Sequence, residues 1–170
     1  QLINVPVHLG LEHYPNIYCG VAVFLLYPLY VMDKDINLCE KIGKSVLLLV
    51  FLTAFNLNIP NFIWHGFHYP NSLPCRQSFI YIFFLLTMCY EALSHIKRMT
   101  SRQLGIAVWI SLGLLVLIEQ VFAVDETYDF KAIYLSGAFI LVYAGLMIVY
   151  NKTNWKLPVT VFLAFIVCII

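Results

Sequence analysis

The residues best suited to chemistry lie in one short stretch, NFIWHGFHYPNSLPCRQSF, at positions 61–79. It places two imidazoles, His65 and His68, near one guanidinium, Arg76. Arginine presents a planar fork of donors that fits a phosphate in two-point contact, and histidine can hydrogen-bond a sugar or phosphate oxygen. The stretch therefore predicts a binding site for a phosphate or a sugar. The alternative for Arg76 is an interfacial anchor that reaches lipid phosphates from a helix end.

A metal site is the other chemistry that the H-x-x-H spacing of His65 and His68 suggests. No carboxylate and no third imidazole lies in the same stretch, and Gly66 opposes a regular helical turn that would align the two rings. We therefore expect no metal there. Hydrogen bonding to a ligand and a simple position at the membrane interface both stay open for the two histidines.

A tetrapeptide, HYPN, occurs twice, at 13–16 and at 68–71. Four matching residues do not establish an internal repeat. Both copies nevertheless place polar side chains just before an apolar run, where a ligand approaching from outside would meet them. We therefore add His13, Tyr69 and Asn71 to the candidate ligand-binding residues.

The composition places this stretch at a membrane. Hydrophobic residues make up 62% of the chain and charged residues 11%, which is far more apolar than a soluble domain requires. A spanning helix needs about 20 mostly apolar residues. Apolar runs that predict such helices occur at 17–32, 45–59, 78–96, 104–124, 132–150 and from 157 onward. The first two runs are short, so we expect them to borrow flanking residues, to tilt, or to lie where protein covers them.

The predicted fold class is thus an all-α membrane protein, a polytopic bundle with about six transmembrane helices. We expect residues 1–170 to be a transmembrane region of a longer chain. Gly66, Pro70 and Pro74 break helix formation, and Trp64 and Tyr69 are typical of the membrane interface. Residues 60–77 are therefore predicted to form an outer re-entrant or interfacial loop.

The distribution of basic residues predicts the orientation. The loops at 33–44, 97–102 and 152–156 hold eight of the ten Lys and Arg. Short cytoplasmic loops are enriched in these residues. We therefore expect the three loops in the cytoplasm, and residues 61–79 and 125–131 outside.

Two carboxylates fall within predicted spans. Ionisable groups at membrane depth usually face the interior of the bundle. Glu91 and His95 are four residues apart, which places them on one helix face. We expect Glu91 to form a structural pair with His95 or with a nearby lysine, whereas Glu119 lies nearer the outer loop.

The chain contains no phosphate-binding Walker loop, no dinucleotide fingerprint and no hydrolase elbow. Nothing in it supports binding of nucleic acid.

The stretch at 61–79, together with LEHYPNIYCG upstream, resembles the YfhO family of bacterial multi-pass membrane proteins. The resemblance rests on His65, Gly66, Phe67, Pro70, Asn71, Pro74, Arg76, Ser78 and Phe79. Gln77 departs from the family pattern, where an aromatic residue is expected, and Cys75 is a second departure.

This resemblance implies a C-type glycosyltransferase in the bacterial plasma membrane. Such an enzyme moves a sugar from an undecaprenyl-phosphate carrier to a cell-envelope polymer, such as lipoteichoic acid, on the outer face. Its catalytic base is expected in an outer loop upstream of this chain, so no catalytic residue is assigned here.

The partners implied are membrane lipid, the polyprenyl-phosphate-linked sugar and the polymer acceptor. Arg76 with His65 or His68 would stabilise the leaving phosphate, so the chemistry needs no metal or other cofactor. Two alternatives stay open. A transporter or lipid flippase would place polar groups through the middle of the bilayer, and a structural membrane subunit would need no convergent polar loop.

Overall fold

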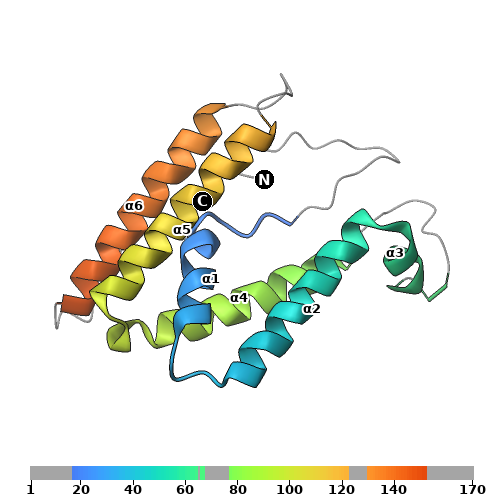
Figure 1. Ribbon diagram of the computed structural model, residues 1–170, viewed down its shortest axis with the longest axis horizontal. Helices are drawn as coiled ribbons and strands as arrows, with labels where there is room; N and C mark the ends of the chain where they lie inside the picture. The colour runs from blue at the N-terminus through green and yellow to red at the C-terminus, as the bar shows by residue number, and fades with distance from the viewer. Residues whose placement is uncertain (1–16, 65, 68–76, 123–129, 153–170) are drawn as a thin grey trace.

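The computed structural model describes residues 17–64, 66–67, 77–122 and 130–152. Every regular element in these ranges is a helix, which confirms the all-α prediction for this part of the chain (Figure 1). The elements are α1 (Ala22–Met32), α2 (Leu38–Asn56), α3 (Asn58–Trp64), α4 (Ser78–Ser94), the 3-10 turn η1 (Ile96–Arg98), α5 (Ser101–Phe122) and α6 (Phe130–Lys152).

Two of the predicted spans are long and apolar enough to cross a membrane. They are Ser101–Gln120 in α5 and Lys131–Lys152 in α6. In contrast, α1 has 11 residues, or about 16 Å of helix, against roughly 30 Å of hydrocarbon. Helix α4 has 17 residues, and α2 starts with the charged residues Glu40, Lys41 and Lys44. The described part thus contains two candidate spans, and the run from 157 onward lies outside it.

Helix α1, the shortest helix formed by a predicted span, is enclosed by other helices. Helix α1 lies at the centre of the molecule and packs against α4, α5 and α6 (Figure 1). Leu25, Leu29 and Tyr30 of this helix are fully buried. The expectation that a short apolar run is covered by protein is therefore confirmed for α1.

A proline within α1 explains one polar contact in this core. Pro28 has no N–H, so the carbonyl of Phe24, four residues earlier, loses its usual helical donor. The buried hydroxyl of Ser111 on α5 lies 2.7 Å from that carbonyl and donates to it. The same hydroxyl lies 2.7 Å from the Ala107 carbonyl of its own helix. Helix α5 thus supplies the donor that α1 lacks.

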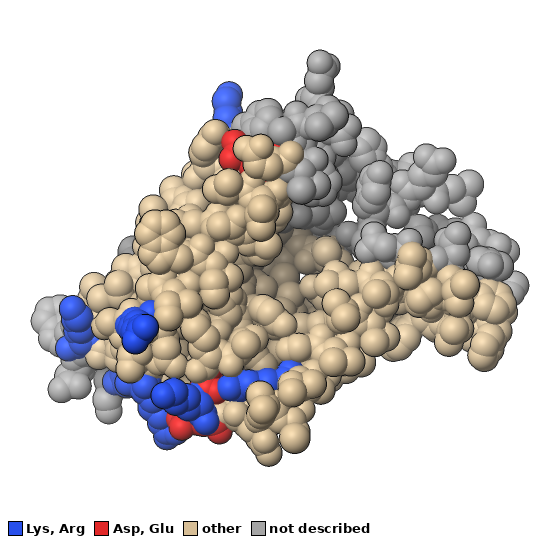
Figure 2. Space-filling view, in the orientation of Figure 1, with Lys and Arg blue, Asp and Glu red and all other residues tan. Residues whose placement is uncertain are grey.

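Basic side chains gather at one end of the bundle, in the lower part of Figure 2. Among the described residues, seven of the eight Lys and Arg lie there, and we call this the basic end. They are Lys34, Lys41, Lys44, Lys97, Arg98, Arg102 and Lys152. The eighth, Lys131, is the second residue of α6, and this helix starts at the opposite end (Figure 1). The loops predicted to share one side of the membrane therefore do meet, and which side they face stays a prediction.

Candidate functional site

All six residues predicted to bind ligand lie outside the described residues. They are Arg76, His65, His68, Tyr69, Asn71 and His13. How they come together therefore stays a prediction. The structure does describe both ends of the predicted loop at 60–77, which we call its flanks. They are α3 with Gly66 and Phe67 at one end, and Gln77 at the other.

The first flank ends α3 with a left-handed cap. Gly66 has φ +68°, a conformation that glycine adopts without strain. Its N–H donates to the Ile63 carbonyl at 3.1 Å, and the Phe67 N–H donates to the Phe62 carbonyl at 3.0 Å. These two bonds form a Schellman motif, and the Phe62 and Phe67 rings add its usual apolar contact, with centroids 5.9 Å apart. The prediction that Gly66 breaks the helix is confirmed.

This capped helix is anchored on α2. Trp64, the last residue of α3, packs edge-on against Phe51, with ring centroids 4.8 Å apart. Phe51 is 2% exposed, so the contact joins α3 to the core. The first residues of the predicted loop are therefore held by a long helix.

The second flank holds a buried polar group that the sequence reasoning missed. Gln77 directly follows Arg76 and precedes α4, and it is 2% exposed. Its carbonyl accepts from the Ile80 and Tyr81 N–H groups at 3.1 and 3.3 Å. Its side-chain amide has no hydrogen-bond partner in the described part of the protein, and burying an unpaired amide is costly. The signal in the sequence was a glutamine at a position where the resemblance implies an aromatic residue.

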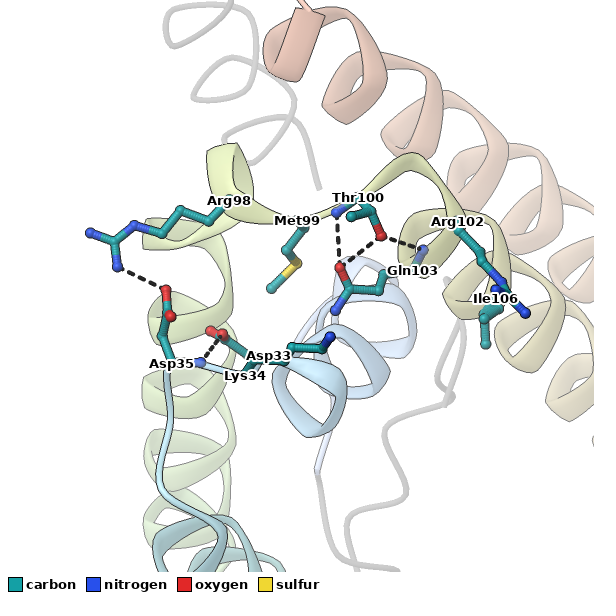
Figure 3. Close-up of a pocket in the computed structure, with 9 residues that line it drawn as sticks. All are labelled: Asp33, Lys34, Asp35, Arg98, Met99, Thr100, Arg102, Gln103 and Ile106. Carbon is teal, nitrogen blue, oxygen red and sulfur yellow. Dashed lines mark hydrogen bonds and ion pairs between the residues drawn. The ribbon is translucent and has the colours of Figure 1, made fainter.

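A second polar cluster lies at the basic end. Asp33 is 4% exposed. One of its carboxylate oxygens lies 2.7 Å from His95 Nδ1, and the other accepts from the Asp35 N–H at 2.9 Å. Arg98 Nη1 donates to the Asp35 carboxylate at 2.8 Å (Figure 3). This hydrogen bond is the main reason why the pKa of Asp35 lies below its ordinary value. The cluster joins the turn after α1 to the end of α4 and η1.

The donor atoms of Asp33, Asp35 and His95 lie within 4.8 Å of one another, as a divalent cation would require. However, each carboxylate already has a partner, since Asp33 is held by His95 and Asp35 by Arg98. The Lys41 side chain also donates to the Asp33 carbonyl. We therefore interpret the cluster as an ion-pair junction that stabilises the fold.

The carboxylate of Glu91 is also held by a partner from another helix. Lys44 Nζ on α2 lies 2.6 Å from Glu91 on α4, and 2.6 Å from Glu40 one helical turn away. The prediction that Glu91 pairs with a nearby lysine is confirmed. The other option, a pair with His95, is not what forms, because His95 bonds Asp33 instead. Glu119, at the opposite end, accepts from the Tyr134 hydroxyl at 3.1 Å.

Comparison with known proteins places the whole chain in one family. The family model described as bacterial membrane protein YfhO matches residues 7–170. No curated protein and no solved structure was found to match the chain. The family match includes both flanks, the predicted loop between them and the basic end. This protein therefore belongs to the YfhO family of bacterial membrane proteins.

Proposed function

We propose that this chain is part of an integral membrane glycosyltransferase. It would move a sugar from an undecaprenyl-phosphate carrier to a cell-envelope polymer, such as lipoteichoic acid, on the outer face of the bacterial plasma membrane. The observation that supports this proposal is membership of the YfhO family, because the C-type glycosyltransferase activity is what that family implies.

The residues of the predicted loop suit such a reaction. When the sugar leaves its carrier, negative charge develops on the lipid phosphate, and fixed cationic or hydrogen-bond donors at that position lower the barrier. Arg76 would hold the phosphate in two-point contact, with His65 or His68 as a further donor. Tyr69, Asn71 and His13 would hydrogen-bond the sugar or the phosphate. A carboxylate upstream would take the proton from the acceptor hydroxyl.

The flanks of the loop support this assignment in physical terms. The capped helix α3 is packed on α2 through Trp64 and Phe51. At the other flank, Gln77 is buried and directly precedes α4. A site that must hold a phosphate in a defined geometry needs such rigid supports. The unpaired amide of Gln77, next to Arg76 in the chain, is a polar group that a bound sugar would satisfy.

The orientation of the proposed enzyme follows from the basic end. Its Lys and Arg residues would face the cytoplasm, and the loop with Arg76 would face outside in a multi-pass arrangement. This places the proposed site on the side where the polymer acceptor is found.

The test is reconstitution of the full-length protein in liposomes with a radiolabelled polyprenyl-phosphate sugar and the polymer. We expect label in the polymer. Movement of the lipid-linked sugar between leaflets with no transfer would instead support the transporter or flippase alternative. If neither transfer nor movement occurs, the structural-subunit alternative is supported.

Residues 1–170 alone provide a control in the same assay. We expect them to insert as helices without transferring sugar, because no carboxylate lies beside the histidines and Arg76 within 61–79. Transfer by residues 1–170 alone would show that the base lies within them.

A further inference from the structure

A cavity of about 600 Å³ opens at the basic end, between the turn after α1 and the start of α5 (Figure 3). Its charged lining consists of Lys34, Arg98 and Arg102 with Asp33 and Asp35. Thr100 and Gln103 also line it, but they bond each other as a capping box at the start of α5.

Two of the cationic side chains in this cavity have no bonding partner in the described part of the chain. Asp33 is hydrogen-bonded to His95 at 2.7 Å, and Asp35 is paired with Arg98 at 2.8 Å, so each carboxylate already has a partner. Lys34 and Arg102 are exposed, and within the described ranges they have no ion pair or hydrogen bond. The cavity therefore offers two free positive charges to an anion.

An apolar groove of about 560 Å³ lies between α1, α2, α4 and α5. Its lining is mostly aliphatic and aromatic, and several of these side chains are open to the surroundings. Val31 is 45% exposed, Leu49 61% and Leu114 42%. Figure 2 shows the surface hollowed between the part formed by α5 and α6 and the part formed by α2 and α4.

The linings of the groove and the cavity are neighbours along the chain. Along the chain after α1, Met32 lines the groove and Asp33 lines the cavity. On α5, Ile106 lines the cavity, and Ile110, one helical turn further, lines the groove. From Ile106 to Leu114, the two hollows follow α5 for about 12 Å. That length fits within the roughly 15 Å of hydrocarbon in one leaflet.

We propose that the cavity and the groove form one binding site for an anionic phospholipid. Its phosphate would lie between Lys34 and Arg102, and one acyl chain would follow the groove between α1 and α5. The order of charge and apolar surface matches that of a lipid, because the two free cations lie at the rim and the apolar walls extend from them. The charged part of this site lies at the basic end, and the proposal does not rest on the proposed sugar transfer.

The test measures lipid retained by the purified full-length protein, using native mass spectrometry after exposure to mixed phosphatidylglycerol and phosphatidylcholine. We expect preferential retention of phosphatidylglycerol. The double variant Lys34→Ala/Arg102→Ala should bind it roughly thirtyfold more weakly, the scale expected for two cations beside an anionic headgroup. The pair Lys97→Ala/Lys152→Ala removes the same charge from the same end outside the cavity, and it should leave binding unchanged.

A second pair of variants tests the groove. Leu114→Trp fills it and should weaken phosphatidylglycerol binding, whereas Leu117→Trp, at an exposed position outside the groove, should not. The charge-preserving variant Lys34→Arg/Arg102→Lys should retain the lipid, which separates lost charge from misfolding. Inorganic phosphate should fail to displace the lipid, because it has no hydrocarbon chain.

The proposal is overturned if Lys34→Ala/Arg102→Ala binds phosphatidylglycerol as the wild type does, or if the Lys97→Ala/Lys152→Ala control loses as much. It is also overturned if Leu114→Trp has no effect and free phosphate competes, since that result describes an anion site alone. Absence of retained phosphatidylglycerol from the wild type would overturn it as well.

Discussion

The two ends of the bundle differ in how their polar side chains are bonded. At the basic end, polar side chains from separate parts of the chain bond one another, as in Asp33 with His95, and Lys44 with Glu91. At the opposite end, the described flanks of the predicted loop hold a buried glutamine amide with no partner and a residue other than glycine at positive φ, Phe67. Among the described residues at the basic end, the single atoms Tyr30 Oη and Glu91 Oε2 are buried without a hydrogen bond, whereas at the other end a whole side-chain amide, that of Gln77, is unpaired.

This difference suggests which polar groups stabilise the fold and which bind a ligand. Buried polar groups that only stabilise a fold are expected to be paired, and those left unpaired or strained cluster at sites that bind ligands. We therefore expect substitutions at the basic end to change stability, and substitutions near the loop to change sugar transfer.

The largest stability effect is expected for Asp33→Ala. This change leaves His95 and the Asp35 N–H without their acceptor at a position that is 4% exposed. Hydrogen bonds to charged groups contribute about 1.5 to 3 kcal/mol, so the free energy of unfolding should fall by roughly that amount. Reversible unfolding in detergent measures it. Asp35→Ala, at an exposed position, is the matched control, and an equal loss there would contradict the role of the buried pair.

Gln77→Leu should have the opposite effect on stability. Replacing an unpaired buried amide by an apolar side chain of similar size removes a desolvation cost, so stability should stay equal or rise by about 1 kcal/mol. Sugar transfer by the full-length protein should fall. A variant that gains stability and keeps full transfer would show that the amide has no part in binding.

A smaller loss of stability is expected for Gly66→Ala. An added Cβ meets open space, so the cost comes from the backbone alone, which holds φ +68°. A left-handed conformation costs an alanine about 1 kcal/mol. Gly105→Ala, within α5 and also in open space, should stabilise the protein instead. Equal effects of the two changes, measured by thermal unfolding in detergent, would rule out the capping role of Gly66.

The smallest effect is expected for Arg98→Ala, and it depends on pH. In the folded protein, the hydrogen bond from Arg98 lowers the pKa of Asp35 from its ordinary 3.8. A lowered carboxyl pKa stabilises the fold above about pH 4, and this stability is lost as the pH falls through the folded value. In Arg98→Ala the pKa should return toward 3.8, so unfolding should depend less on pH below about 4.

Unfolding midpoints between about pH 3 and 6 measure this dependence. At neutral pH the two proteins should differ little, because the Arg98 side chain is 70% exposed and that of Asp35 is 42% exposed. An unchanged pH profile would mean that the pair does not persist in solution.

Hydropathy predicted the existence of the helices better than their starts. The expected runs 78–96, 104–124 and 132–150 correspond to α4, α5 and α6 within a few residues. Helix α2 starts at Leu38 rather than at 45, because Asn37 caps it by accepting from the Cys39 N–H at 3.3 Å. The helix then continues through Glu40, Lys41 and Lys44. The predicted run leaves out these charged residues because that run is defined by apolar residues.

The polar cluster at the basic end could be predicted only in part. A lysine near Glu91 was expected, because a carboxylate at membrane depth needs a partner. The bond between Asp33 and His95 joins residues 62 positions apart, and no local pattern indicates it. The sequence predicts Asp33 and Asp35 only as loop residues, because the burial of Asp33 and the pairing of both residues arise when α1 packs against α4.

The role of Arg76 in holding the carrier phosphate is tested by sugar transfer per folded molecule, measured for Arg76→Ala and for Arg102→Ala in the full-length protein. Both changes remove one arginine next to a helix start, at opposite positions in the predicted topology. We predict that Arg76→Ala lowers transfer by more than roughly tenfold, because charge-assisted hydrogen bonds to the carrier phosphate contribute about 1.5 to 3 kcal/mol. Arg76→Lys should recover part of the activity, and Arg102→Ala should keep it. Full transfer by Arg76→Ala, across a range of carrier concentrations, would contradict the proposed site.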